Sequence, residues 1–175
     1  FRRGMLGVLL GAAALGGGSA SAEDPVAAVQ ASGTIPEDRL LDVGIEVFEK
    51  SRHARKPIPA ADPQVIEDLR KAEGRFLPIQ LRDTLEATGQ WGAVRVLPPG
   101  LSVTDLTVYG QMFDANGRRL ELRIRAVDSR GTKWLDREYY WQAEAKDYPR
   151  GAPGAQYAFR SVFNQIANDL VHARD

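Results

Sequence analysis

Residues 105–128, DLTVYGQMFDANGRRLELRIRAVD, carry the strongest short hairpin signal in the chain. Asn116 and Gly117 stand near the centre of this stretch, and this dipeptide favours a two-residue hairpin turn because both turn positions need a positive φ. After the turn, the run LELRIRA alternates apolar and charged residues, which is typical of a strand with one buried face and one wet face. The sequence therefore predicts an antiparallel hairpin of strands 105–113 and 118–128.

Downstream, the hairpin continues into a three-strand meander and a final helix. A turn at 128–131 leads into TKWLDREYYWQ, residues 132–142, which reads as the third strand. A loop rich in proline and glycine follows. The last helix then carries its apolar residues at the spacing of a core-facing stripe: Phe159, Val162, Phe163, Ile166 and Leu170.

Upstream, the order is strand, helix, strand. Residues 40–48 alternate with a period of two, which is a strand signal. Asp62 before Pro63 favours the start of a helix. Glycine and proline then interrupt the helical pattern at 74 and 78, so we expect two helical pieces or one kinked helix. A glycine at 89 ends it, and GAVRVLP reads as the second strand.

This order predicts an α+β fold with a single mixed or antiparallel sheet. Strand-helix-strand is followed by the three-strand meander, and the helices pack on one face of the sheet. We expect one core between sheet and helices, built from Leu81, Leu85, Leu122, Ile124, Phe163 and Ile166.

Residues 1–22 are predicted to be a secretory signal peptide. Arg2 and Arg3 precede the uncharged run Met5–Leu15, and Ala-Ser-Ala at 20–22 supplies the small residues of a cleavage site. The apolar run is shorter than the roughly 20 residues of a membrane span. A buried alanine-rich helix is the alternative, but three glycines follow the run, and each costs about 1 kcal/mol in a helix relative to alanine.

The remainder divides into a leader and one domain. Residues 23–39 are small, polar and marked by proline, so they read as a flexible leader. Residues 40–175 are expected to form a single α/β periplasmic domain. A chain of about 150 residues can bury a hydrophobic core that is stable without disulfides or a structural metal. Phe1 in place of a start methionine, and Asp175 at a helix end without a capping signal, fit a chain cut from a longer one.

The net charge and the absence of cysteine limit the classes of partner and site that we expect. Removal of the signal peptide leaves 21 Lys and Arg against 23 Asp and Glu, a net charge of −2. No imbalance points to nucleic acid or to an anionic membrane surface. The chain has no cysteine, so a disulfide, a thiolate metal site and the lipid anchor of a bacterial lipoprotein are not expected. We expect a soluble periplasmic protein with no membrane span after signal cleavage.

Candidate catalytic residues are few. His53 lies in the basic loop SRHARK with Ser51 two residues before it, but no orienting carboxylate is evident. His172 lies three residues from the chain end and is expected to be exposed. Asp42 and Glu46 share one side of the first strand, which we interpret as facing solvent.

Metal and phosphate sites find no support in the sequence either. DANG at 114–117 resembles the start of a calcium loop but lacks the bidentate Glu at the required distance, so a hairpin turn is the better interpretation. The glycines near the amino terminus belong to the signal segment. The sequence therefore predicts no catalytic, cofactor-binding or metal-binding residue, no cofactor and no enzymatic activity.

The aromatic residues of the third meander strand are more suggestive. Trp134, Tyr139, Tyr140 and Trp141 crowd into one strand, and both residue types are enriched at protein interfaces. Alternation directs Tyr139 and Trp141 to one side and Trp134 and Tyr140 to the other. The second pair lies either beneath a loop or the carboxy-terminal segment, or at an interface. These four residues are our candidate protein-binding site.

The segments RFLPIQLRDTLEATGQWGAVRVLP, TDLTVYGQMF, RLELRIRAVDSRGTKWLDREY and FNQIANDL resemble a group of uncharacterised proteobacterial envelope proteins. More distantly, the chain is similar to the periplasmic α/β domains of the curli-secretion lipoprotein and of the TolB amino-terminal region. The resemblance spans about residues 40–170. The positions that match its pattern are Leu81, Leu85, Gly89, Val94, Asp105 and Gly110.

This resemblance implies a non-enzymatic role in contact with other envelope proteins, as an accessory to envelope assembly, secretion or transport. Many such relatives are lipoproteins, and the missing cysteine is a departure from them. The alternative is a small periplasmic hydrolase or carbohydrate-binding protein that uses an aromatic-lined groove. A flat apolar edge with scattered carboxylates favours the first function, and a pocket that converges on two acids and an aromatic wall favours the second.

Overall fold

The computed structural model describes residues 26–52, 63–101, 103–116, 119–142 and 159–175. The predictions for the signal peptide, for His53 and for the turn residue Gly117 lie outside these ranges.

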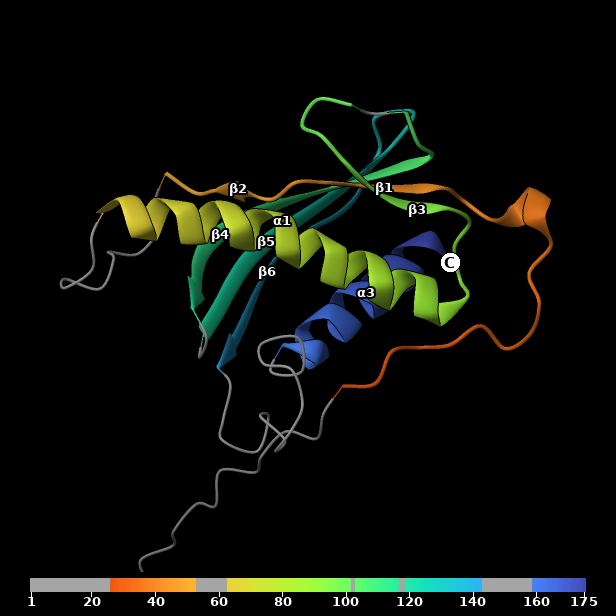
Figure 1. The fold of residues 1–175 in the computed structure, drawn as a ribbon. Helices are drawn as coiled ribbons and strands as arrows, with labels where there is room; N and C mark the ends of the chain where they lie inside the picture. The colour runs from red at the N-terminus through yellow and green to blue at the C-terminus, as the bar shows by residue number, and fades with distance from the viewer. Residues whose placement is uncertain (1–25, 53–62, 102, 117–118, 143–158) are drawn as a thin grey trace, which may run out of the picture.

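Over the described ranges, the fold consists of one sheet and two long helices (Figure 1). The helical elements are a 3₁₀ turn at Glu37–Arg39, α1 at Pro63–Thr88 and α3 at Arg160–Arg174. The strands are β1 Val43–Glu46, β2 Glu49–Lys50, β3 Val94–Leu97, β4 Leu106–Asn116, β5 Arg119–Asp128 and β6 Lys133–Gln142.

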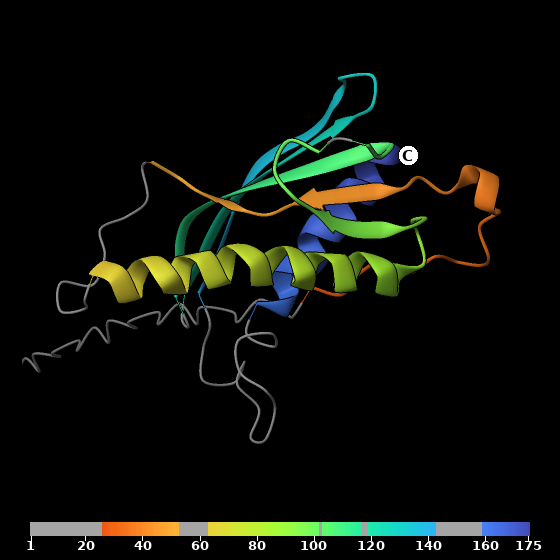
Figure 2. The ribbon, with the colours of Figure 1, turned by 45° about the horizontal axis from the view of Figure 1, so that its top comes forward.

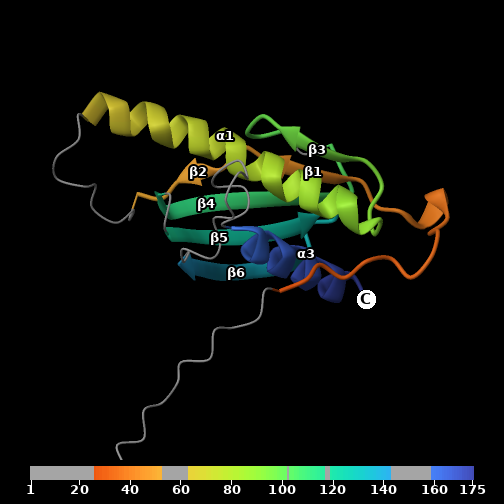
Figure 3. The same cartoon turned by 60° about the horizontal axis from the view of Figure 1, so that its bottom comes forward.

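The sheet is mixed. Its strand order is β3-β1-β4-β5-β6, with β1 parallel to both neighbours and β2 parallel to β4. Strands β4, β5 and β6 form the antiparallel meander. Both helices lie on one face, α1 over the parallel part and α3 over the meander (Figure 3). The predicted α+β class, the antiparallel pairing of the two hairpin strands and the one-sided helix layer are confirmed. The prediction that Asn116 occupies a turn position at positive φ is wrong, because Asn116 pairs with Arg119 as the last residue of β4.

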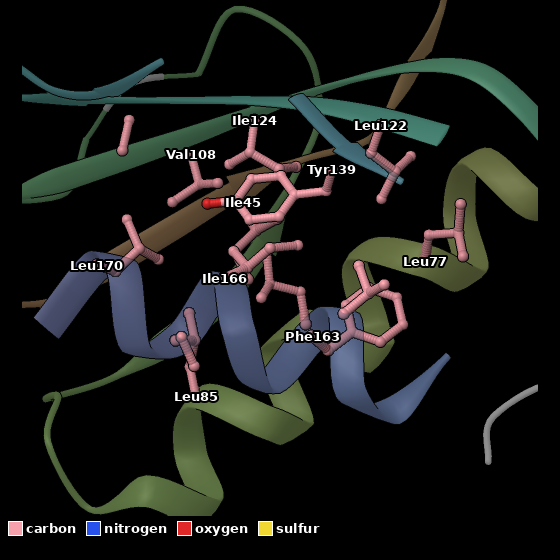
Figure 4. Close-up of a cluster of buried hydrophobic side chains, with 14 of the residues drawn as sticks. Ile45, Leu77, Leu85, Val108, Leu122, Ile124, Tyr139, Phe163, Ile166 and Leu170 are labelled. Carbon is pink, nitrogen blue, oxygen red and sulfur yellow. The ribbon is translucent and has the colours of Figure 1, made fainter. Parts of the chain in front are cut away.

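The core lies between the sheet and the helices, on what we call the helix face of the sheet. All six core residues predicted from the sequence are at most 2% exposed. Figure 4 shows the side chains of the strands meeting those of α3 and α1 in this layer. At the end of α1, Gly89 has a φ of 64°, the left-handed conformation expected of a residue just past a helix.

Helix α1 runs without a break through the glycine and proline that interrupt its pattern. Pro78 has no N–H, so the carbonyl of Gly74 loses its usual donor four residues later. The N–H of Phe48 donates to that carbonyl instead, with an N···O distance of 3.0 Å. The freed carbonyl therefore ties α1 to the chain between β1 and β2.

Phe48 separates β1 from β2 because it is turned into the core. Its ring lies against Gly110 of β4, where a Cβ would overlap it. A Cβ at Gly74 would lie 2.8 Å from the carbonyl oxygen of Phe48, so the helix also needs a glycine at its closest approach. Of the predicted strand 40–48, only Val43–Glu46 forms a strand, and the short strand β2 begins after Phe48.

The connection from β3 to β4 has to cross β1, because those two strands flank it. It crosses on the side opposite the helices. A Cβ at Gly44 would overlap Leu97 and Thr104, and the Glu46 carboxylate accepts the N–H of Gly100 at 3.0 Å. Glu46 is only 8% exposed. The interpretation of this strand side as solvent-facing is therefore wrong, since a non-local crossover covers it.

Part of the leader region lies along α3. The N–H of Val29 donates to Asn168 Oδ1 at 2.7 Å, and the N–H of Ala31 donates to the carbonyl of Thr88 at 2.8 Å. These bonds fix residues 26–31 to both helices. Among the described residues, no helix combines the length and apolar character that a bilayer crossing requires.

Candidate functional site: the open face of the sheet

The side of the meander opposite the helices carries the candidate site, and we call it the open face (Figure 2). The ladder register assigns its residues, because positions directly opposite in neighbouring strands share a side. Tyr109 pairs with Arg125, and Gln111 pairs with Arg123. The open face includes Tyr109 and Gln111 of β4, Glu121, Arg123 and Arg125 of β5, Asp136, Glu138 and Tyr140 of β6, and Glu49 of β2. Thr107 of β4 lies on the same side but is buried near the crossover.

A groove of about 500 Å³ lies on this face. Its lining includes Glu46, Glu49, Tyr109, Gln111, Arg123, Arg125 and Asp136. Acidic residues of β1 and β2 stand on one side of the groove, and arginines of β5 stand on the other. The floor between them is β4, whose residues here are polar but uncharged.

Arg123 forms an ion pair with Asp136 of the neighbouring strand β6. Its Nε donates to Asp136 Oδ1 at 2.7 Å, and Lys133 Nζ lies 3.3 Å from the other carboxylate oxygen. The hydrogen bond from Arg123 holds the pKa of Asp136 below its ordinary value and raises that of Arg123. Asp136 therefore stays ionised at neutral pH.

Arg125 has a different environment. Its guanidinium lies 4.8 Å from the centroid of the Tyr109 ring, within the range of a cation–π contact. No carboxylate among the described residues forms an ion pair with Arg125, and the same holds for Glu49 and the described cations. Arg125 and Glu49 thus face each other across the groove, and neither has a charged partner in the part of the chain that the structure describes.

The structure separates the four aromatic residues of the candidate binding site. Tyr139 is 3% exposed and belongs to the core, where Figure 4 shows it pointing toward α3. Trp141 packs partly buried against that core. Tyr140 is 56% exposed on the open face. Its hydroxyl donates to Gln142 Oε1 at 2.9 Å. That the strand takes part in binding stays a prediction.

Trp134 does not share the exposed environment of Tyr140, although simple alternation put the two on one side. A bulge shifts the β5–β6 register between Ala126 and Val127. Trp134 packs against the core beyond this point, and its indole N–H donates to Asp128 Oδ2 at 3.2 Å. The prediction that Trp134 and Tyr140 share a face is therefore wrong, because a bulge breaks the period of two.

Tyr139 ties β6 to α3. Its hydroxyl donates to Asp169 Oδ2 at 2.6 Å, and the Arg137 guanidinium donates to the same oxygen at 3.0 Å. Burial, followed by the bond to this carboxylate, raises the pKa of the phenol well above its ordinary value. The phenol therefore serves the fold as a protonated hydrogen-bond donor.

The remaining candidates from the sequence do not converge on a site. Ser51 is buried and its N–H bonds the carbonyl of Met112. His172 is exposed in the last turn of α3. Asp114 lies in the paired part of the hairpin, 3.6 Å from Arg119. Within the described ranges, no group of three or more His, Cys, Asp or Glu residues could hold a metal ion.

The groove itself has only a partial signal in the sequence. The alternation along β5 predicts that Arg123 and Arg125 lie on the solvent-facing side of the strand, and this is the part of the groove that the sequence indicates. Glu49 reaches the same groove only because β2 pairs with β4 across more than sixty residues of chain, Glu49 opposite Gln111. Nothing local in the sequence indicates that pairing.

Comparison with known proteins gives only distant structural likeness. No protein-family model and no curated protein matches the chain. The chain is similar to protein XCC0632 of family DUF330 from Xanthomonas campestris, with 14% identity and a TM-score of 0.42 over 84% of this chain and 90% of that one.

Two further solved structures are similar at the same level. A PelC dodecamer from Paraburkholderia phytofirmans has 13% identity and a TM-score of 0.48 over 82% of this chain and 91% of that one. The hypothetical protein CT253 from Chlamydia trachomatis has 7% identity and a TM-score of 0.41 over 77% and 95%. At these values none of the three establishes a family for this chain.

Proposed function

We propose that this chain is a non-enzymatic protein-binding module of the cell envelope, acting in the periplasm as an accessory to assembly, secretion or transport. It binds its partner through the open face. The observation that carries the proposal is the one-sided layering: both helices cover one face of the sheet, and the other face of the meander presents Tyr140, 56% exposed, beside the charged groove.

The chemistry of the open face supports binding to a protein. Tyrosine and arginine are enriched among the residues that contribute most to protein interfaces. Here Tyr109, Tyr140, Arg123 and Arg125 occupy three neighbouring strands, whose ladders hold them in fixed positions. Such preorganisation lowers the entropy lost on binding. The signal-peptide pattern of the first 22 residues supports an envelope location.

The same groove gives less support to a hydrolase or a carbohydrate-binding protein. Acid catalysis needs a carboxyl group that is protonated near neutral pH, whereas Arg123 keeps Asp136 ionised. The Glu46 carboxylate already accepts a backbone N–H from the crossover loop. A sugar would stack on a free aromatic face, and Arg125 occupies a face of Tyr109, the aromatic residue of the groove.

Quantitative capture from envelope extract tests the proposal. Tyr140→Ala should leave the melting temperature unchanged and weaken capture of the partner about thirtyfold if Tyr140 is an interface anchor. Phe76→Ala is the matched control, because Phe76 is an aromatic residue of α1 that is 38% exposed on the helix side. Equal capture by both variants, or a loss confined to Phe76→Ala, would contradict the proposal.

A further inference from the structure

The groove on the open face has walls of opposite charge. Glu46 and Glu49 stand on the β1–β2 side, and Arg123 and Arg125 stand on the β5 side. Strand β4 separates them with Tyr109 and Gln111, so the walls are two strand spacings apart, about 10 Å. An occupant that lies along β4 therefore meets negative charge on one flank and positive charge on the other.

Three of the five charged residues of the lining are already engaged, and the other two have no ion-pair partner among the described residues. Arg123 is paired with Asp136 at 2.7 Å, and Glu46 accepts the N–H of Gly100 at 3.0 Å. Arg125 rests on the Tyr109 ring, and Glu49 is exposed on β2. Neither forms an ion pair with another described residue. Charge complementarity thus calls for an acidic group toward Arg125 and a basic group toward Glu49.

The shape and polarity of the groove favour a segment of chain over a small molecule. Sites that bury small ligands are lined mainly by apolar side chains, whereas charged and amide side chains dominate this lining. An extended peptide directs successive side chains to opposite sides. Laid along β4, it would send one set of side chains toward Glu49 and the alternate set toward Arg125. The Gln111 amide on the floor can both donate to and accept from its backbone.

From this arrangement we infer that the groove binds an extended segment of the protein partner in which basic and acidic residues alternate. The inference rests on the proposed function and specifies the partner segment that the open face recognises. Arg125 binds the acidic side chain, Glu49 binds the basic one, and the two contacts fix the register of the segment on the sheet.

Fluorescence anisotropy with two labelled peptides tests this inference on the chain after signal removal. One peptide is an eight-residue alternation of Lys and Glu, and the other has the same composition with four Lys followed by four Glu. The alternating peptide should bind at least about tenfold more tightly, because only alternation satisfies both walls at once. Equal affinity for the two peptides, or no binding of either at millimolar concentration, would overturn the inference.

Charge reversal provides the second arm. Arg125→Glu and Glu49→Lys should each weaken binding of the alternating peptide about tenfold, since both walls then carry one sign. The double variant should bind within about threefold of the original, because the peptide can shift by one residue to meet the inverted walls. Arg95→Glu, an exposed change on β3 away from the groove lining, should have no effect. A double variant as weak as the single ones would contradict the assignment.

Different results contradict the proposal that the open face binds a partner and the inference that the groove binds an alternating segment. Partner capture that depends on Tyr140, together with peptides that do not distinguish the groove variants, would overturn the peptide inference and leave the open face as the binding surface. Circular dichroism and the melting temperature of each variant show that its fold is intact before binding is compared.

Discussion

The two faces of the sheet show different relations between sequence and structure. On the helix face, apolar residues of every long strand meet the stripes of α1 and α3, and local periodicity identifies many of them. On the opposite side, the residues are polar, but their environments differ from one end of the sheet to the other. Thr107 and Glu46 are buried near the crossover, whereas Arg125 and Tyr140 are exposed.

This difference shows that alternation reports which residues share a side, not what covers that side. The β1 end is closed by the connection from β3 to β4, which follows from a strand order that places β1 between them. The meander end stays open because no described element crosses it on that side. The open face is therefore the part of the sheet where polar residues are available to a partner.

Truncation of the core should produce the largest effect. Phe163→Ala removes a ring that is 2% exposed between α3 and the sheet, so it should lower the free energy of unfolding by about 3–5 kcal/mol. Urea unfolding measures this loss. A change near zero would mean that α3 is not part of the cooperative core.

Substitutions at two neighbouring residues of β5 compare the contribution of the two faces to the free energy of unfolding. Ile124→Ala on the helix face should cost about 2–5 kcal/mol, because the side chain is fully buried. Arg123→Ala on the open face should leave the urea midpoint close to that of the unmodified protein. Equal shifts for the two variants would show that the faces of β5 are wrongly assigned.

The contact of Phe48 with Gly110 tests the packing of the broken strand. Gly110→Ala would force a methyl group against the Phe48 ring and should cost about 1–3 kcal/mol. Gly33→Ala is the control, since nothing lies within 4 Å of the added atom. Combining Gly110→Ala with Phe48→Leu should recover part of the loss, and strict additivity of the two changes would argue against the contact.

The buried phenol of Tyr139 predicts that the stability of the fold depends on pH. Its pKa is raised in the folded state, while an unfolded tyrosine titrates near about 10. The unfolded chain therefore loses the proton first, and this contribution to stability is present below about pH 10 and declines as the pH rises further. Tyr139→Phe should weaken that decline and cost about 1–2 kcal/mol through loss of the bond to Asp169. Phenolate absorbance of the folded protein that includes Tyr139 at its ordinary pKa would contradict the burial.

Much of the fold follows from local chemistry. The Asn116-Gly117 dipeptide marks the β4–β5 hairpin, Gly89 marks the end of α1, and the stripe from Phe159 to Leu170 marks α3. Each of these signals is contained within a few turns or one strand pair. They therefore predict the class, the meander and the core without knowledge of distant contacts.

The site depends on contacts that no local pattern encodes. The crossover over Glu46 follows from strand order, and the shift at Trp134 follows from a bulge within β6. Glu49 and Arg125 meet at one groove because two pairings on either side of β4 bring them together. The sequence shows four aromatic residues in one strand, but only the structure distinguishes the buried Tyr139 from the exposed Tyr140.

Site-specific photocrosslinking in intact cells shows whether the partner binds the open face. A benzophenone-bearing amino acid is placed at Tyr140 in one strain and at Phe76 of α1 in another, both exposed aromatic positions. The account predicts a discrete protein adduct from position 140 and none from position 76. Adducts from position 76 with none from position 140 would show that the partner binds the helix side, and would contradict the account.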